Sequence, residues 1–352
     1  MPTDFRRILL IKPSSLGDIV HALPTATLLK RLFPAASLTW LVKRQWADVL
    51  EGNSALDRIL AVDLSLGGWA AAMGAVRAGR FDLVVDLQGL FRSAVLGWFS
   101  GAPVRVGFAN GREGSPWFYT QKVAVTDPEM HAVDRYLLIP RSLGVAPPST
   151  AAPRFPLAVD HGADDKVSEM LISAGALAGS PLVAINAGAR WATKQWPSSA
   201  FADVADQLQD EGIRVVVIGR EAEGDPGSAL MDHMRTSAIN LVGKTSIKEL
   251  IALLRRVRLL ITNDSGPMHL AAAVGTPIVA LFGPTDPHRT GPYGPGHLVL
   301  RSGIPCSPCF SRRCVNPKTL ECLTSISPSQ VFHQALDYVR QTGEPASKCE
   351  VR

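Results

Sequence analysis

The stretch that decides the fold runs from Leu259 to Pro287 and reads LLITNDSGPMHLAAAVGTPIVALFGPTDP. Its first four residues continue an apolar strand, whereas residues 263–267 all favour a turn or a helix cap. Pro267 suits the first turn of a helix, an alanine-rich run continues that helix, and Gly275 ends it. A second apolar run over residues 277–282 follows. The order strand, turn, helix, strand is the unit of a parallel sheet.

The turn at residues 263–267 is the first candidate for a ligand site. In parallel sheets, ligands bind outside the carboxyl ends of the strands, where backbone N–H groups and the helix dipole favour a phosphate. The turn is therefore predicted to hold a phosphate or a nucleotide sugar. The alternative is that Asp264 or Ser265 serves only as the N-cap of the helix, which is a common role at this position. Both interpretations can hold together.

The chain as a whole predicts two domains of the α/β class. Its 352 residues exceed one ordinary core, and 46% hydrophobic with 19% charged residues is typical of a globular protein. A strand at residues 7–12, a polar loop and a helix open the first half, and a strand at 181–185 restarts the same order. We expect two Rossmann-like α/β/α domains, residues 1–156 and 157–352, joined by the proline-rich segment 144–156, with a terminal helix in the second.

Charge and hydropathy limit the possible partners. The net charge is +5, and residues 1–160 hold 17 Lys and Arg against 13 Asp and Glu, whereas the remainder holds 19 against 18. This excess is a weak indication of an anionic partner or a membrane surface, and a solvated surface is the usual explanation for so mild an excess. No run of Lys and Arg interleaved with aromatic residues supports nucleic-acid binding. Because neither a membrane span nor a signal peptide is apparent, we expect a cytoplasmic protein.

Common catalytic motifs are absent, which leaves a site distributed over strand-end loops. The sequence contains no G-x-G-x-x-G, no G-x-x-x-x-G-K-[ST] and no G-x-S-x-G. Asp18, at a helix start, is positioned as a general base, and Lys194 supplies a compact positive charge for a pyrophosphate beside Asp264, Ser265 and His269. Each residue also has an ordinary structural interpretation. Asp18 would be a helix-dipole carboxylate, Lys194 a solvated loop charge and His269 a hydrogen-bonded core histidine.

Four long motifs carry a resemblance to a known family. They are KPSSLGDIVHALP, FDLVVDLQGLFRSA, HAVDRY and NDSGPMHLAAAVGTPIVALFGPTDP, and with them the likeness extends over residues 7 to about 335. The chain resembles the lipopolysaccharide heptosyltransferases of glycosyltransferase family 9. The resemblance implies a GT-B architecture with an interdomain cleft, an N-terminal acceptor-binding domain and a C-terminal ADP-sugar donor-binding domain. It also implies transfer of L-glycero-D-manno-heptose from ADP-heptose to the lipopolysaccharide inner core, with inversion and without a metal or other cofactor.

The resemblance also implies roles for particular residues. Asp18 matches the family's catalytic base, in a motif that places Ser15 and Gly17 among the substrate-binding residues. Lys194 matches the lysine that contacts the donor phosphates, and the donor-binding turn supplies Asp264, Ser265, Gly266 and His269. Glu223 matches the acidic residue near the adenosine ribose, with Glu221 as the alternative. The motifs QGLFRSA and HAVDRY look closest to heptosyltransferase I, which adds the first heptose to Kdo of Kdo2-lipid A, although residues 186–190 lack the paired threonines of some such enzymes.

Several alternatives stay open at this point. A type II or type III heptosyltransferase, or another family 9 transferase, would use a different acceptor or donor, and a non-catalytic nucleotide-sugar binding protein would turn over nothing. An acceptor on lipid A implies peripheral contact with the inner face of the inner membrane. Four cysteines, Cys306, Cys309, Cys314 and Cys322, have a spacing compatible with a structural zinc site or with reduced thiols.

Overall fold

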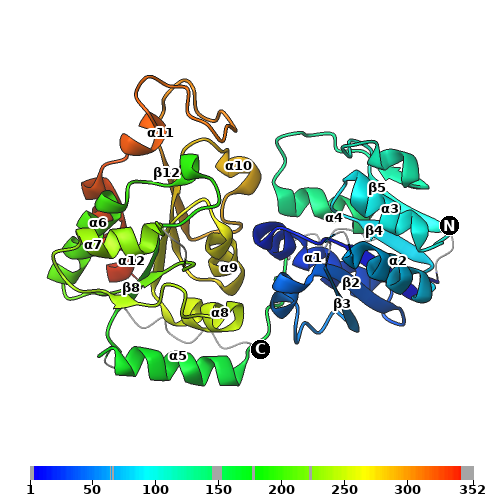
Figure 1. Ribbon diagram of the computed structural model, residues 1–352, viewed down its shortest axis with the longest axis horizontal. Coiled ribbons are helices and arrows are strands. Elements are labelled where there is room, and N and C mark those ends of the chain that lie inside the picture. The colour runs from blue at the N-terminus through cyan, green and yellow to red at the C-terminus, as the bar shows by residue number, and fades with distance from the viewer. Residues whose placement is uncertain are drawn as a thin grey trace. The chain divides into compact units, whose positions relative to one another are not determined.

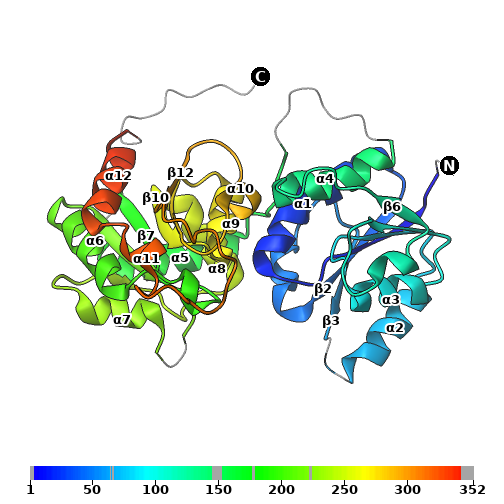
Figure 2. The same ribbon diagram turned by 90° about the horizontal axis from the view of Figure 1, so that it is seen from above.

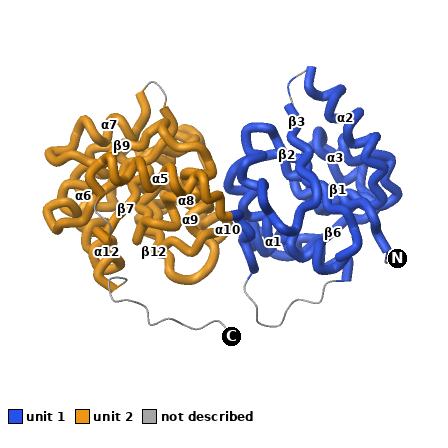
Figure 3. The backbone as a smooth tube through the Cα atoms, turned by 90° about the horizontal axis from the view of Figure 1, so that it is seen from below, with its two compact units in different colours: residues 1–158 blue, residues 159–352 orange. Residues whose placement is uncertain are grey.

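The computed structural model describes residues 4–63, 65, 67–144, 153–176, 179–221 and 224–341. The chain divides into two compact units, residues 1–158 (unit 1) and 159–352 (unit 2), which Figure 3 shows in different colours. Each unit contains one six-stranded sheet in which all strands are parallel, with helices on both faces (Figure 1). The α/β class predicted from the alternating strand and helix patterns is therefore confirmed.

The sheet of unit 1 has the strand order β3-β2-β1-β4-β5-β6. Helices α1 and α4 lie side by side, as do α2 and α3, and Figure 2 shows these two pairs on opposite faces of the sheet. Its elements are β1 (Arg7–Ile11), α1 (Leu16–Leu32), β2 (Ser37–Lys43), η1 (Arg44–Val49), β3 (Arg58–Val62), α2 (Gly68–Ala78), β4 (Leu83–Asp86), α3 (Phe91–Phe99), β5 (Val104–Phe108), η2 (Ser115–Phe118), β6 (Gln121–Val123) and α4 (Ala132–Ser142).

The sheet of unit 2 has the strand order β12-β11-β10-β7-β8-β9, which is the order of unit 1 read from the other edge. Helix α6 packs against α7 and α12, whereas α8 packs against α5 and α9 (Figure 1). Its elements are α5 (His161–Ser173), β7 (Leu182–Asn186), η3 (Ala192–Lys194), α6 (Ser198–Asp210), β8 (Arg214–Ile218), α7 (Pro226–His233), β9 (Ile239–Asn240), α8 (Ile247–Arg256), β10 (Leu259–Asn263), α9 (Gly266–Val274), β11 (Ile278–Phe282), α10 (Pro287–Thr290), β12 (His297–Arg301), α11 (Glu321–Thr324) and α12 (Pro328–Gln341).

The stretch 259–287 folds as its sequence predicts. Strand β10, helix α9 and strand β11 follow one another, and β10 pairs with β11 in parallel register from Leu260 opposite Ile278. Gly275 ends the helix with φ 83°, a left-handed backbone that glycine adopts at little cost. All five residues of each strand are buried, which is why both strands are continuous apolar runs without alternation.

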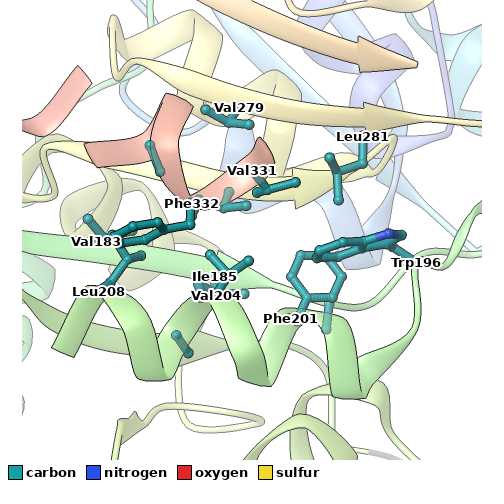
Figure 4. Close-up of a cluster of buried hydrophobic side chains, with 14 of the residues drawn as sticks. Val183, Ile185, Trp196, Phe201, Val204, Leu208, Val279, Leu281, Val331 and Phe332 are labelled. Atoms are coloured by element: carbon teal, nitrogen blue, oxygen red, sulfur yellow. The ribbon is translucent and has the colours of Figure 1, made fainter. Parts of the chain in front are cut away.

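A large apolar core fixes one face of the unit 2 sheet. Strands β7 and β11 contribute Val183 and Leu281, which lie between α6 and α12 (Figure 4), and β10 contributes Leu259 to the same cluster. The indole of Trp196 is 1% exposed and meets the ring of Phe201 edge to face, with 4.9 Å between the ring centroids. Because Trp196 directly follows the loop after β7, the core anchors that loop and with it Lys194.

Two local features complete the description of unit 1. The segment 107–127 contains the 3₁₀ turn η2 and the edge strand β6, which pairs with β5 over three residues. Helix α1 begins at Leu16, so Gly17 and Asp18 lie in its first turn and not in the preceding loop. The proline-rich segment 145–152 lies outside the described residues.

Candidate functional site

The predicted site residues lie where the strand order of each sheet reverses. In unit 1, the loop after β1 leads to Asp18, and Asp86 is the last residue of the adjacent strand β4. In unit 2, the adjacent strands β7 and β10 lead to the loop of Lys194 and to the turn of Asp264. Such reversal points are the places where open parallel sheets bind ligands, because the two flanking loops diverge there.

Asp18 is held by hydrogen bonds from several elements of unit 1. Its Oδ2 accepts from the backbone N–H of Ser15 at 3.0 Å and from the Ser15 hydroxyl at 2.8 Å. Its Oδ1 accepts from the hydroxyl of Tyr136 at 3.1 Å, and Lys12 Nζ lies 3.5 Å away. The bond to the Ser15 backbone is the ordinary helix-capping role, whereas the contacts with Tyr136 and Lys12 go beyond it.

The charges around Asp18 keep it ionised. Partial burial acts to raise the pKa of its carboxyl, but the ammonium of Lys12 and the hydrogen bonds from Ser15 outweigh it and hold that pKa well below the usual range. Burial likewise acts to lower the pKa of Lys12, and the charge of Asp18 overcomes this so that the pKa is raised. Burial and the Asp18 charge raise the pKa of Tyr136 to about 12, so its hydroxyl stays a donor at neutral pH.

The motif HAVDRY meets the N-terminal motif in space. His131 begins α4 by accepting a hydrogen bond from the Val133 N–H at Nδ1, and its ring lies 5.2 Å from that of His21 on α1. Tyr136 then reaches Asp18 across 118 residues of sequence. Two motifs that the sequence showed only as separate segments therefore build one polar cluster.

Another carboxylate, that of Asp86 at the end of β4, is fully buried. Asp86 Oδ2 accepts from the hydroxyls of Ser93 at 2.8 Å and Tyr119 at 2.7 Å, and its Oδ1 accepts from the N–H groups of Gln88 and Gly89. Burial raises the pKa of this carboxyl despite these four donors. The network ties the loop after β4 to residue 119 and so fixes the η2 segment against the sheet.

In unit 2, Lys194 and Asp264 form a close ion pair. Lys194 Nζ lies 2.5 Å from Asp264 Oδ2, and this oxygen also accepts from the Thr285 hydroxyl at 2.6 Å. The Asp264 side chain is 6% exposed and that of Lys194 is 17% exposed. Lys194 Nζ also lies 4.8 Å from the centre of the Trp191 ring. The interpretation of Lys194 as a freely solvated loop charge is therefore wrong.

Ser265 occupies the N-cap position of α9 but does not cap the helix through its side chain. Its hydroxyl instead accepts a hydrogen bond from Asn186 Nδ2 at 2.9 Å and lies 3.1 Å from the Thr262 hydroxyl. Gly266 is the first residue of α9, and His269 is buried one turn later. The capping alternative thus explains the position of Ser265 but not its side chain, and the first N–H groups of α9 keep no serine oxygen as a partner.

Asn263 links the two strand-end loops of unit 2. Its Oδ1 accepts from the Trp196 N–H at 3.0 Å, and its Nδ2 donates to the Ala187 carbonyl at 2.7 Å. The side chain is fully buried, so these two bonds fix the spacing between the Lys194 loop and the Asp264 turn. Sequence patterns did not single out Asn263, because a turn-forming residue at the end of a strand is expected only to end that strand.

Two sequence-based hypotheses remain to be placed. Glu223 lies outside the described residues, whereas the alternative, Glu221, is exposed beside Gly243. The four cysteines are free thiols, and in the described part of the chain no three His, Cys, Asp or Glu side chains are arranged to hold a metal ion. The structure therefore does not support the zinc alternative over reduced thiols. None of the helices in the described ranges is long and apolar enough to cross a bilayer.

Solved structures with the same architecture identify the fold class. The chain is 26% identical to a family 9 glycosyltransferase from Veillonella parvula, with a TM-score of 0.85 over 97% of this chain and 99% of that one. It is 25% identical to ADP-heptose lps heptosyltransferase II of E. coli, with a TM-score of 0.78 over 95% and 99% of the two chains. The two Rossmann-like units and their strand-end sites define a GT-B glycosyltransferase.

Sequence comparison then gives the family. The model of glycosyltransferase family 9 (heptosyltransferase) matches residues 69–320, and the chain belongs to this family. It is 29% identical to lipopolysaccharide heptosyltransferase 1 of Pseudomonas aeruginosa over 93% of this chain and 96% of that protein. It is also 27% identical to lipopolysaccharide heptosyltransferase 2 of E. coli over 84% and 88% of the two chains. Relatives named heptosyltransferase 1 and relatives named heptosyltransferase 2 thus resemble this chain at similar identity.

Proposed function

We propose that this protein transfers L-glycero-D-manno-heptose from ADP-heptose to Kdo of Kdo2-lipid A, with inversion at the anomeric carbon. Family membership and relatives named as heptosyltransferases support the reaction class. The observation that supports binding of the ADP-heptose donor is the Lys194–Asp264 pair beside the N-terminus of α9. A cation and a row of helix N–H groups are the chemistry that a sugar diphosphate requires.

Asp18 is the proposed catalytic base. As the acceptor oxygen forms its bond to the anomeric carbon, its hydroxyl proton passes to Asp18, and the bond from the anomeric carbon to the ADP oxygen breaks. The Asp18 side chain is 41% exposed, so a hydroxyl can reach it, and its low pKa keeps it deprotonated at neutral pH. A weakly basic carboxylate accepts the proton late, when the attacking oxygen has become strongly acidic.

Lys194 and the first turn of α9 are the proposed donor site. The departing ADP gains negative charge as the sugar leaves. The Lys194 ammonium and the positive end of the α9 dipole stabilise that charge more in the transition state than in the bound donor. Lys194 acts here through its pairing with Asp264, because the pair holds the ammonium beside the turn. We further propose that Gly266 and His269 line this site, that Ser15 and Gly17 shape the Asp18 turn, and that Glu223 contacts the ribose.

The test is transfer onto a panel of acceptors. Purified protein with ADP-heptose should convert Kdo2-lipid A into a product heavier by one heptose residue, with release of ADP. Transfer only onto an acceptor that already bears heptose would replace this proposal by a type II or type III activity. Tight binding of ADP-heptose without any product would favour a non-catalytic binding protein. Peripheral contact with the inner membrane belongs to the same proposal, since lipid A is membrane-embedded.

A further inference from the structure

Unit 1 carries a cluster of exposed aromatic side chains on two neighbouring elements. In its described part, every large hydrophobic residue that is strongly exposed belongs to α3 or to η2. Phe91 is 48%, Trp98 54% and Phe99 40% exposed, and Trp117 is 87% exposed. Soluble surfaces expose single large apolar residues routinely, but a contiguous group marks an interaction site.

The rings of Phe91, Phe118, Trp98 and Phe99 form a chain of contacts, and Trp117 directly precedes Phe118 in η2. Phe91 and Trp98 lie seven residues apart on α3 and hence on one face of the helix. The ring of Phe118 packs edge to face against both, at 5.6 Å from Phe91 and 6.5 Å from Trp98 between centroids. The opposite face of α3 is buried, where Gly97 approaches Val84 of the sheet. Helix α3 thus has one apolar face on the core and a second that faces outward.

The fold holds this surface in a fixed shape. The guanidinium of Arg105 donates to the carbonyl of Phe118 through Nε at 2.8 Å, and Tyr119 is bonded to buried Asp86. The N–H of Arg112 donates to the carbonyl of Gly89 at 2.9 Å, which joins the start of the η2 segment to the start of α3. Hydrogen bonds at residues 112, 118 and 119 therefore fix the backbone that carries Phe118.

Basic side chains border the aromatic residues. Arg92 and Arg112 are exposed beside Phe91 and η2, and Arg77 donates to the Ser100 carbonyl at the far end of α3. Glu113 is an exposed acidic neighbour and accepts a hydrogen bond from the Phe91 N–H at 3.3 Å. Among residues 1–160, Lys and Arg exceed Asp and Glu by four, 17 against 13. Tryptophan and phenylalanine with flanking arginine match the interface of an anionic bilayer, where rings enter the headgroup layer and cations meet phosphates.

We infer that the exposed aromatic face of α3 and η2, namely Phe91, Trp98, Phe99 and Trp117 bordered by Arg92 and Arg112, is a docking surface for an anionic lipid bilayer. The inference rests on the proposed function in one respect, since an enzyme whose acceptor is anchored in a bilayer must bind at the bilayer surface. A membrane fits better than a protein partner, because exposed arginines next to exposed rings match anionic headgroups that lie over an apolar layer.

The test is vesicle flotation of the full-length protein with phosphatidylethanolamine and phosphatidylglycerol vesicles. The wild type should float with them and should bind phosphatidylcholine vesicles far more weakly. Trp117→Ser should lower the affinity about tenfold, and Arg92→Glu about fivefold with a loss of that difference at high salt. Val315→Ser is the matched control, because this 92% exposed apolar side chain lies in unit 2, and its binding should equal that of the wild type.

The outcomes separate this inference from the proposed reaction. Trp117→Ser should transfer heptose to a lipid-free acceptor fragment as the wild type does, but should lose turnover on vesicle-embedded acceptor. Vesicle binding by the wild type without any transfer would overturn the proposed reaction and leave the docking surface standing. Equal flotation of wild type, Trp117→Ser and Arg92→Glu would overturn the docking surface. So would a dimeric wild type that Trp117→Ser makes monomeric, because a second copy would then cover this face.

Discussion

The Asp264 carboxylate binds the ammonium of Lys194 at 2.5 Å, although 70 residues of sequence separate them. This pair joins the loop after β7 to the turn after β10, which are neighbouring strands of one sheet. A lysine meant only as a solvated charge would not be fixed in this way. The pair suggests that one residue supplies charge and the other supplies its position, and mutations can separate these two contributions.

Lys194→Met should both destabilise the fold and abolish tight donor binding. Removing the ammonium leaves the Asp264 carboxylate buried beside a neutral donor, the Thr285 hydroxyl, so we expect a loss of about 3 kcal/mol in unfolding free energy. The double variant Lys194→Met/Asp264→Asn should recover most of that stability but not the affinity for ADP-heptose. Denaturant unfolding and calorimetric titration measure the two quantities. Recovery of donor affinity in the double variant would show that Lys194 acts only through stability.

Asp18→Ala should lower turnover by about a hundredfold or more while donor affinity stays near that of the wild type. The reason is that Asp18 is the proposed proton acceptor and belongs to the other unit from the Lys194–Asp264 pair. Initial rates at saturating donor, together with a direct binding measurement, provide the check. Asp82→Ala is a suitable control, because this carboxylate accepts from the backbone N–H groups of Arg6 and Arg7 at the opposite end of the sheet, before β4. Wild-type turnover in Asp18→Ala would remove the residue from the mechanism.

Lys12→Met should move the acid limb of the turnover profile to higher pH. In the wild type, the Lys12 ammonium holds the pKa of Asp18 below its ordinary value, so activity should not fall because of Asp18 in the mildly acidic range. Without the ammonium, the pKa of the Asp18 carboxyl should rise, because burial is then opposed by the hydrogen bonds from Ser15 but no longer by the Lys12 charge. Turnover measured against pH with Kdo2-lipid A in detergent would show the shift. An unchanged profile with reduced activity at every pH would indicate that Lys12 has only a structural role.

The same pair predicts how stability depends on pH. The folded-state pKa of Asp18 lies below its unfolded value of about 3.9, so its contribution is complete above that value and disappears as the pH falls through the folded pKa. The pKa of Lys12 is raised, so its contribution is present below about pH 10.4 and disappears as the pH rises through the folded value. Lys12→Met should therefore reduce the dependence of the unfolding free energy on pH at both the acidic and the basic extreme. Denaturant titrations across pH would show this reduction.

Local sequence patterns predicted the strand, turn and helix units well, because a buried parallel strand followed by turn residues leaves a clear signal. They placed Asp18 and Asp264 at strand ends for the same reason. They did not reveal that Tyr136 donates to Asp18 or that Thr285 donates to Asp264, since those contacts depend on which strands become neighbours in the sheet. Lys12 was also overlooked. A single lysine that follows an apolar run indicates in sequence only that the strand ends. In the structure, however, the Lys12 side chain is buried beside Asp18.

Asn263→Ala should weaken donor binding without removing any residue that we expect to touch the donor. The fully buried amide holds the Trp196 N–H and the Ala187 carbonyl, and its loss leaves both without this partner. Each buried group left unsatisfied costs about 1 to 3 kcal/mol, so we expect a loss of about 2 to 5 kcal/mol in unfolding free energy.

The functional effect should be larger than the stability effect alone would produce. Because Asn263 sets the spacing between the Lys194 loop and the Asp264 turn, the variant should bind ADP-heptose about tenfold more weakly at a temperature where it remains folded. Asn240→Ala is the matched control. That exposed asparagine also accepts from a backbone N–H, of Val242 at 3.0 Å, but lies on the edge strand β9. Its stability should fall by no more than about 1 kcal/mol, and its donor affinity should not change. Equal donor affinity in both variants would mean that the two loops keep their spacing without Asn263.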